Sequence, residues 1–74
     1  MAKIEIETEV SGNVWKIEKQ VGDRLEEDDV IMILESMKME IPVEATGPGT
    51  LTEILVNVDD QVEEDQIVAI IESD

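Results

Sequence analysis

The chain has 74 residues, which we expect to form one domain spanning residues 1–74, too small for a multi-layer enzyme. Its 20 acidic and 5 basic residues give a formal net charge of −15, which repels nucleic-acid phosphates and anionic membrane surfaces, so neither is an expected partner. A hydrophobic fraction of 42% predicts a folded chain, and because cysteine and histidine are absent, buried apolar side chains must supply its stability.

The first predicted strand covers residues 4–8, where isoleucine and threonine alternate with glutamate in the period-two pattern of a half-buried strand. A second strand follows Gly12, where Trp15 and Ile17 alternate with charged residues. On this alternation both side chains face inward. We expect Trp15 to be an anchor in the core or on a sheet face rather than a recognition residue.

A turn and a very short strand come next. Val21-Gly22-Asp23 has the composition of a turn, and Leu25 then supplies one inward residue before the acidic turn at residues 26–29. The apolar run over residues 30–34 has strand length, which is typical of a strand buried on both faces. These elements make four strands in the first half of the chain.

The second half of the chain repeats the first. A shift of 37 residues aligns Gly12–Ser36 with Gly49–Ser73 without a gap, and ten of these 25 pairs are identical. In addition, 23 of the 74 residues are Ile, Val or Thr, whose β-branched side chains favour strands over helices. We therefore predict an all-β fold of two four-stranded antiparallel sheets packed face to face, with the halves related by a quasi-twofold axis.

The two copies differ where the halves join, at Met37-Lys38-Met39. This segment follows Ser36 and leads into a new strand, whereas the second copy stops after the matching Ser73 and Asp74. In a tight turn the middle residue points outward, so Lys38 is expected to project its amine into solvent. Two exposed methionines beside it favour a surface that accommodates a partner, because Met side chains adapt to what packs on them.

Residues 35–40 form the motif Glu-Ser-Met-Lys-Met-Glu, with further characteristic positions at Gly12–Val14, Val21–Asp23 and Gly49. With these residues the whole chain resembles the biotinyl domain of biotin-dependent carboxylases, and especially stand-alone biotin/lipoyl attachment proteins. The resemblance implies a flattened β-barrel, or barrel-sandwich hybrid, of two four-stranded sheets with quasi-dyad symmetry. It places the modified lysine in the turn that joins the halves.

The resemblance also implies a non-catalytic carrier, the biotin carboxyl carrier domain of a multienzyme carboxylase such as an acyl-CoA carboxylase. A biotin protein ligase would attach biotin covalently to Lys38. The biotin arm would then shuttle a carboxyl group between biotin carboxylase and carboxyltransferase sites. Met37 and Met39 would serve ligase recognition, with Glu35 and Glu40 beside them as further site residues. The resemblance implies neither a catalytic residue nor a metal ligand.

A lipoyl carrier domain, with lipoate on the same lysine, is the main alternative because it shares the fold. Lipoyl domains usually have Asp before and Ala after the modified lysine, so Met37 and Met39 favour biotin. An unmodified interaction module is a further alternative, although it has no reason to keep an exposed lysine between two methionines. An independent enzyme is the weakest, since the serines have no histidine base to activate them.

The acidic runs at residues 26–29 and 63–65 lie at equivalent turns of the repeat. Solvated loops explain them better than a metal site, because they lack the ligand order of a calcium loop. The chain has no apolar run long enough for a signal peptide or a membrane span. We therefore expect a cytoplasmic protein that is a monomer as an isolated domain.

Overall fold

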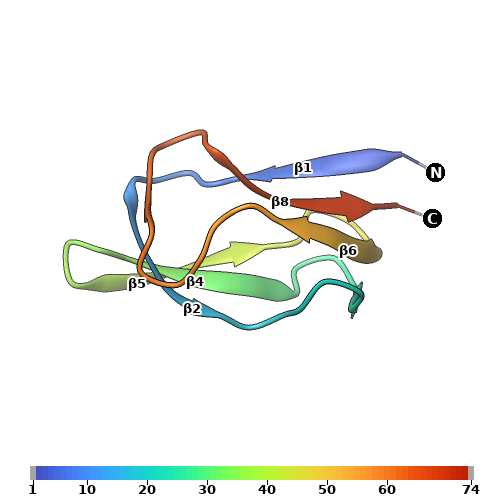
Figure 1. The fold of residues 1–74 in the computed structure, drawn as a ribbon, viewed down its shortest axis with the longest axis horizontal. Helices are drawn as coiled ribbons and strands as arrows, with labels where there is room; N and C mark the ends of the chain where they lie inside the picture. Colours follow the sequence, from blue (N-terminus) through green and yellow to red (C-terminus); the bar gives the residue numbers. More distant parts are fainter. Residues whose placement is uncertain (1, 74) are drawn as a thin grey trace.

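The computed structural model describes residues 2–73, which form eight strands and no helix (Figure 1). The strands are β1 (Lys3–Glu7), β2 (Gly12–Ile17), β3 (Arg24–Leu25), β4 (Val30–Ser36), β5 (Met39–Glu44), β6 (Gly49–Ile54), β7 (Gln61–Val62) and β8 (Ile67–Glu72). The predicted all-β fold with four strands in each half is confirmed. Across this described part of the chain, no helix has the length and hydrophobicity to span a membrane.

The strands form two antiparallel sheets of four, which we call sheet A (β1-β8-β6-β3) and sheet B (β5-β4-β2-β7). Exchanging the two halves of the repeat converts one order into the other, since the 37-residue shift relates β1, β2, β3 and β4 to β5, β6, β7 and β8. Side chains from both sheets meet in one hydrophobic cluster. The predicted pair of sheets with quasi-twofold symmetry is therefore confirmed.

The short strands β3 and β7 connect the two halves. β3 belongs to the first half but pairs with β6 of the second, and β7 pairs in the same way with β2. Equivalent backbone hydrogen bonds support each exchange: Gly22 N donates to Leu51 O (2.7 Å), and Asp59 N donates to Val14 O (2.8 Å). Each sheet thus contains strands from both halves, so neither half has a complete sheet of its own.

The core contains no aromatic side chain among the described residues. Its fourteen buried hydrophobic residues come from both halves: Ile6, Val14, Leu25, Ile31, Met32, Leu34, Val43, Ala45, Leu51, Val56, Val62, Val68, Ala69 and Ile71. Leu25 is fully buried as predicted, and so is its repeat counterpart Val62. Buried Thr8 has its Oγ1 2.9 Å from Val10 O and 2.8 Å from Glu63 O, so the hydroxyl has acceptors within hydrogen-bond distance.

Trp15 does not face the core, which corrects the alternation predicted for β2. The register of β2 against β4 shifts between Val14 and Lys16, so β2 has one extra residue at this point. The bulge leaves Val14 in the core and Trp15 on the outer face with 45% of its surface exposed, while Ile17 packs against the core as predicted. Because a bulge depends on the partner strand, the period-two pattern of β2 alone could not reveal it.

The apolar run in β4 is a strand as predicted, but its burial on both faces is only partial. The register of β4 against β5 shifts between Val30 and Met32, which leaves Ile31 and Met32 both fully buried. Val30 and Ile33 are half-buried. The continuous hydrophobic run therefore reflects a bulge as well as burial, and β8 has the same burial pattern where its pairing with β1 shifts register.

We predict that salt stabilises this fold. Raising the ionic strength from about 0.01 M to about 1 M shortens the screening length from about 30 Å to about 3 Å, which weakens repulsion within a chain of net charge −15. The melting temperature, measured by circular dichroism, should rise by roughly 4–8 °C, the effect of about 1 kcal/mol on a domain of this size.

The control is a variant with Glu26→Gln, Glu27→Gln, Glu63→Gln and Glu64→Gln, which removes four exposed charges at equivalent turns. Its melting temperature should rise less with salt than that of the parent. An equal rise in both proteins would show that salt acts through something other than charge repulsion.

Candidate functional site

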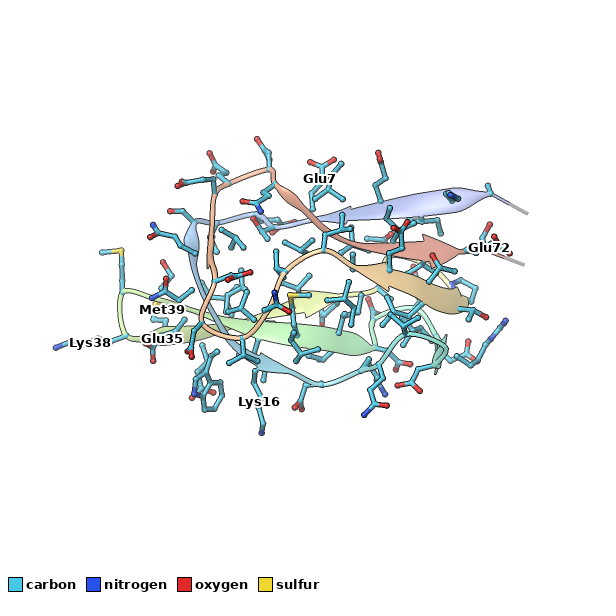
Figure 2. All side chains as sticks on the ribbon, viewed as in Figure 1. Glu7, Lys16, Glu35, Lys38, Met39 and Glu72 are labelled. Atoms are coloured by element: carbon cyan, nitrogen blue, oxygen red, sulfur yellow. The ribbon has the colours of Figure 1, made fainter. Side chains whose placement is uncertain are left out.

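Lys38 lies in the turn that joins β4 to β5. The two strands are in register at Ser36 and Met39, which leaves a two-residue loop of Met37 and Lys38. Both loop residues have positive φ, 51° and 66°, as in a type I′ hairpin turn. The Lys38 side chain is exposed and points away from the body of the protein at one end of its long axis (Figure 2). The lysine amine therefore lies in solvent.

Met37 and Lys38 are unusual residues for this backbone. Left-handed φ values cost a residue with a side chain about 1–2 kcal/mol, and type I′ turns normally use Asn-Gly. This chain has two long side chains there instead. Strain of this kind persists where the surrounding structure enforces it, and it is found most often at functional sites. Asp28, Asp59 and Asp65 also have positive φ, but Asp tolerates it, so the turn is a candidate site because long side chains occupy this backbone.

The two methionines flank the lysine and are strongly exposed. Met37 has 92% of its surface in solvent, and Met39 has 64%. Exposed apolar side chains gathered at one place mark interaction sites, and the unbranched Met side chain repacks easily against different surfaces. The hairpin tip thus combines an exposed amine with an adaptable apolar surface.

Glu35 and Glu40 face each other across the base of this hairpin, and both are exposed. Like charges directly opposite one another destabilise a strand pair. Lys38 does not offset this repulsion by ion pairing, since it takes part in no salt bridge within residues 2–73. The structure therefore brings all five predicted site residues onto one hairpin, with a free amine at the tip and two carboxylates at the base.

Gly12 determines how closely β2 approaches the strand that leads to the site. A Cβ atom on Gly12 would lie 2.6 Å from Glu35 O and 3.2 Å from Ser36 Cβ. Its repeat counterpart Gly49 packs in the same way against Glu72 O, at the end of β8. Gly12 was not predicted as a site residue, although the identical Gly12/Gly49 pair was a signal that both copies need glycine at this place.

The acidic turns have a role in the local backbone structure. Asp29 Oδ2 accepts a hydrogen bond from Glu26 N (2.8 Å), and in the second copy Gln66 Oε1 accepts one from Glu63 N (2.9 Å). Across residues 2–73, no three His, Cys, Asp or Glu side chains lie close enough together to hold a metal ion. The side chains of these turns therefore stabilise the local backbone. Among the described residues they form no cluster that could hold a metal ion.

A cleft of about 320 Å³ lies between the edge strands β1 and β5. Buried Ile6, Leu34 and Val43 line it together with exposed Glu7 and Glu44. The turn residues of the β4–β5 hairpin do not contribute to this lining. The cleft is therefore separate from the lysine at the hairpin tip.

Comparison with known sequences gives a family match over almost the whole chain. A family model described as "Biotin-requiring enzyme" matches residues 3–71. The biotin/lipoyl attachment protein of Bacillus subtilis is 45% identical over 40 residues, which are 54% of this chain and 55% of that protein. A putative urea carboxylase of Emericella nidulans is 52% identical over 40 residues, 54% of this chain but only 3% of that protein.

Solved structures contain the same fold within much longer chains. In the crystal structure of Kluyveromyces lactis urea carboxylase, a segment matches 97% of this chain with a TM-score of 0.93 and 36% identity, and it makes up 6% of that protein. A single-chain, multi-domain long-chain acyl-CoA carboxylase matches 97% of this chain with a TM-score of 0.90 at 17% identity, over 7% of its length. The second likeness concerns the fold alone. The chain thus spans about half of its shorter relative and a small part of each carboxylase.

We predict different consequences for alanine at the two equivalent glycines. Gly12→Ala and Gly49→Ala should each destabilise the protein by about 1–3 kcal/mol, because the new methyl group overlaps a neighbouring strand. Only Gly12→Ala should also displace the hairpin that carries Lys38. Denaturant unfolding followed by Trp15 fluorescence measures the first effect, and amide chemical shifts of residues 36–39 measure the second.

Gly49→Ala is the matched control, since its methyl group lies at the opposite end of the fold. Equal shift changes at residues 36–39 in both variants would contradict a specific role for Gly12 at the site.

Proposed function

The chain belongs to the family of biotin- and lipoyl-attachment domains, and on this basis we propose that it is a biotin carboxyl carrier with Lys38 as the attachment residue. The observation that carries the proposal is the exposed lysine in a strained two-residue turn between two exposed methionines. The likeness to a segment of urea carboxylase supports a carrier role in a carboxylase.

Attachment by a biotin protein ligase requires a lysine amine that can reach an activated acyl group. The amine nitrogen attacks the carbonyl carbon of biotinyl-adenylate, and an amide bond forms. The bond from that carbon to the phosphate oxygen breaks, AMP leaves with the electron pair, and the amine loses a proton. Lys38 suits this reaction because its amine is in solvent and, within the described residues, is not held in a salt bridge.

The position of Lys38 suits a carrier. The β4–β5 turn and the two chain ends lie at opposite ends of the long axis (Figure 1), in a molecule with principal extents of 36 × 19 × 18 Å. Ser73 N donates to Ala2 O (2.7 Å), so these end residues are side by side. When bound, biotin would carry a carboxyl group between a biotin carboxylase and a carboxyltransferase, while the hairpin holds its attachment point away from the polypeptide ends.

The main competing function is that of a lipoyl carrier on the same lysine. The printed name of the Bacillus subtilis relative includes both groups, which supports testing lipoate directly. The methionines on either side of Lys38 favour biotin, since they give the ligase an apolar surface at the attachment residue. An unmodified interaction module remains the third outcome.

We predict that Lys38 is the attachment residue. Incubation with a biotin protein ligase, biotin and ATP should add a single biotinyl group to the parent chain, detected by intact mass spectrometry. Lys38→Arg should receive none, because a guanidinium is not a nucleophile under these conditions. Lys19→Arg is the control and should be modified like the parent. Modification of Lys38→Arg at another lysine would contradict the assignment.

We predict that Met37 and Met39 determine the choice between biotin and lipoate. Met37→Asp combined with Met39→Ala should shift modification from biotin towards lipoate, because it removes the apolar surface beside Lys38 and supplies the residues usual in lipoyl domains. The ratio of biotinylated to lipoylated product, measured with both ligases in parallel, should fall at least about tenfold, the effect of about 1.4 kcal/mol. A double variant that still takes biotin and no lipoate would show that the methionines do not determine the choice.

A further inference from the structure

Trp15 lies on the outer face of sheet B, beside the strand that carries the site. β2 pairs directly with β4, and Asn13 of β2 is opposite Glu35 at the base of the hairpin. Trp15 follows two residues later, at the bulge, with 45% of its surface exposed. The single aromatic residue of the chain is therefore in solvent on a strand next to the attachment hairpin.

The repeat shows that the fold does not require an aromatic residue at this place. The position equivalent to Trp15 is Thr52, and β6 has the same register shift there, between Leu51 and Glu53. Thr52 Oγ1 donates to Ile70 O (3.1 Å), so a small polar side chain fits this bulge with its hydrogen bond satisfied. The backbone arrangement is shared by both copies, but the large exposed ring is present only in the copy next to Lys38.

Outside the hairpin tip, the other exposed large apolar residues are Val21, Val58 and Leu55, and Leu55 (49% exposed) has Glu18 as its counterpart, so it is exposed in the second copy alone. Val21 and Val58 occupy equivalent turns, and both are exposed, so their exposure belongs to the repeated fold. Leaving an indole ring half in water forgoes burial that would otherwise stabilise the protein. The exposed ring is therefore available to a partner that contacts this face.

The surroundings of Trp15 favour a cationic group. Lys16 Nζ already lies 5.5 Å from the centroid of the Trp15 ring, a cation–π arrangement, and it also lies 3.7 Å from Glu18. Glu35 is on the neighbouring strand. Figure 2 shows Lys16 and Glu35 on the side of the molecule that continues toward Lys38. The ring thus already has one cation at cation–π distance, and the nearest carboxylates that the strand pairing gives are Glu18, paired with that cation, and Glu35 on the neighbouring strand.

We propose that Trp15 is a docking residue for the enzyme that acylates Lys38, and that it is covered there by an arginine or lysine from a basic surface of that enzyme. The inference rests on the proposed function, since it assumes that Lys38 is acylated. An enzyme whose active site covers the hairpin tip must also extend over the adjoining strands, and β2 is the strand paired with β4. Charge complementarity with a chain of net charge −15 requires a basic partner surface.

The test is the Trp15→Thr variant, which installs the residue that the fold itself uses at the equivalent bulge. The KM of a biotin protein ligase for this variant should rise at least about tenfold with little change in kcat, the size expected when an aromatic anchor is lost from an interface. The melting temperature should stay close to that of the parent. Thr52→Trp in the Trp15→Thr background restores an exposed ring at the far end of the fold, and it should not restore the KM.

A second measurement does not depend on any substitution. With 5-fluorotryptophan incorporated into this chain alone, the fluorine resonance reports only Trp15, and it should shift on titration with the unlabelled ligase. An unchanged resonance together with an unchanged KM for Trp15→Thr would overturn the proposal, and so would rescue by Thr52→Trp. Failure of the ligase to modify the parent chain would instead overturn the proposed function, which keeps the two failures distinct.

Discussion

The exchange of the short strands β3 and β7 is the interaction on which the rest of the structure depends. Each strand is only two residues long, yet it pairs with a strand of the opposite half and contributes one fully buried side chain, Leu25 or Val62, to the common core. Backbone hydrogen bonds at Val14 and Leu51 fix both exchanges with the same geometry. A core without aromatic side chains is thereby closed from both sides, and the β4–β5 hairpin projects from a base that strands of both halves support.

The internal repeat separates the demands of folding from those of function. Features present in both copies, such as the glycines that let β2 and β6 approach β4 and β8, are needed to build two equivalent sheets. Features present in one copy have another cause. The Met37-Lys38 turn and the exposed Trp15 are such features, and both belong to the hairpin that carries the lysine or to the strand beside it. The asymmetry of a nearly symmetric molecule thus includes the hairpin that carries Lys38 and the strand paired with it.

The net negative charge destabilises the folded chain through repulsion between carboxylates, and it favours association with a basic surface. With 20 acidic residues on a 74-residue chain, repulsion is distributed over the whole surface, and at the base of the hairpin Glu35 and Glu40 are directly opposed. The same field would attract and orient a basic surface of a partner. The negative surface therefore has a folding cost and an association benefit, and both decrease as salt increases.

The sequence by itself determined the strand content, the repeat, the buried Leu25 and the solvent-exposed lysine at the junction, because alternation, turn composition and self-similarity are local properties of the chain. The tertiary structure alone decided which strands pair, where the bulges fall and how closely Gly12 lies to Glu35. These features depend on contacts between residues far apart in the chain, and one extra residue in a strand reverses the direction of the side chains that follow. For that reason the alternation in β2 misplaced Trp15, whereas the exposure of Lys38 followed from its place at the junction between the two copies of the repeat.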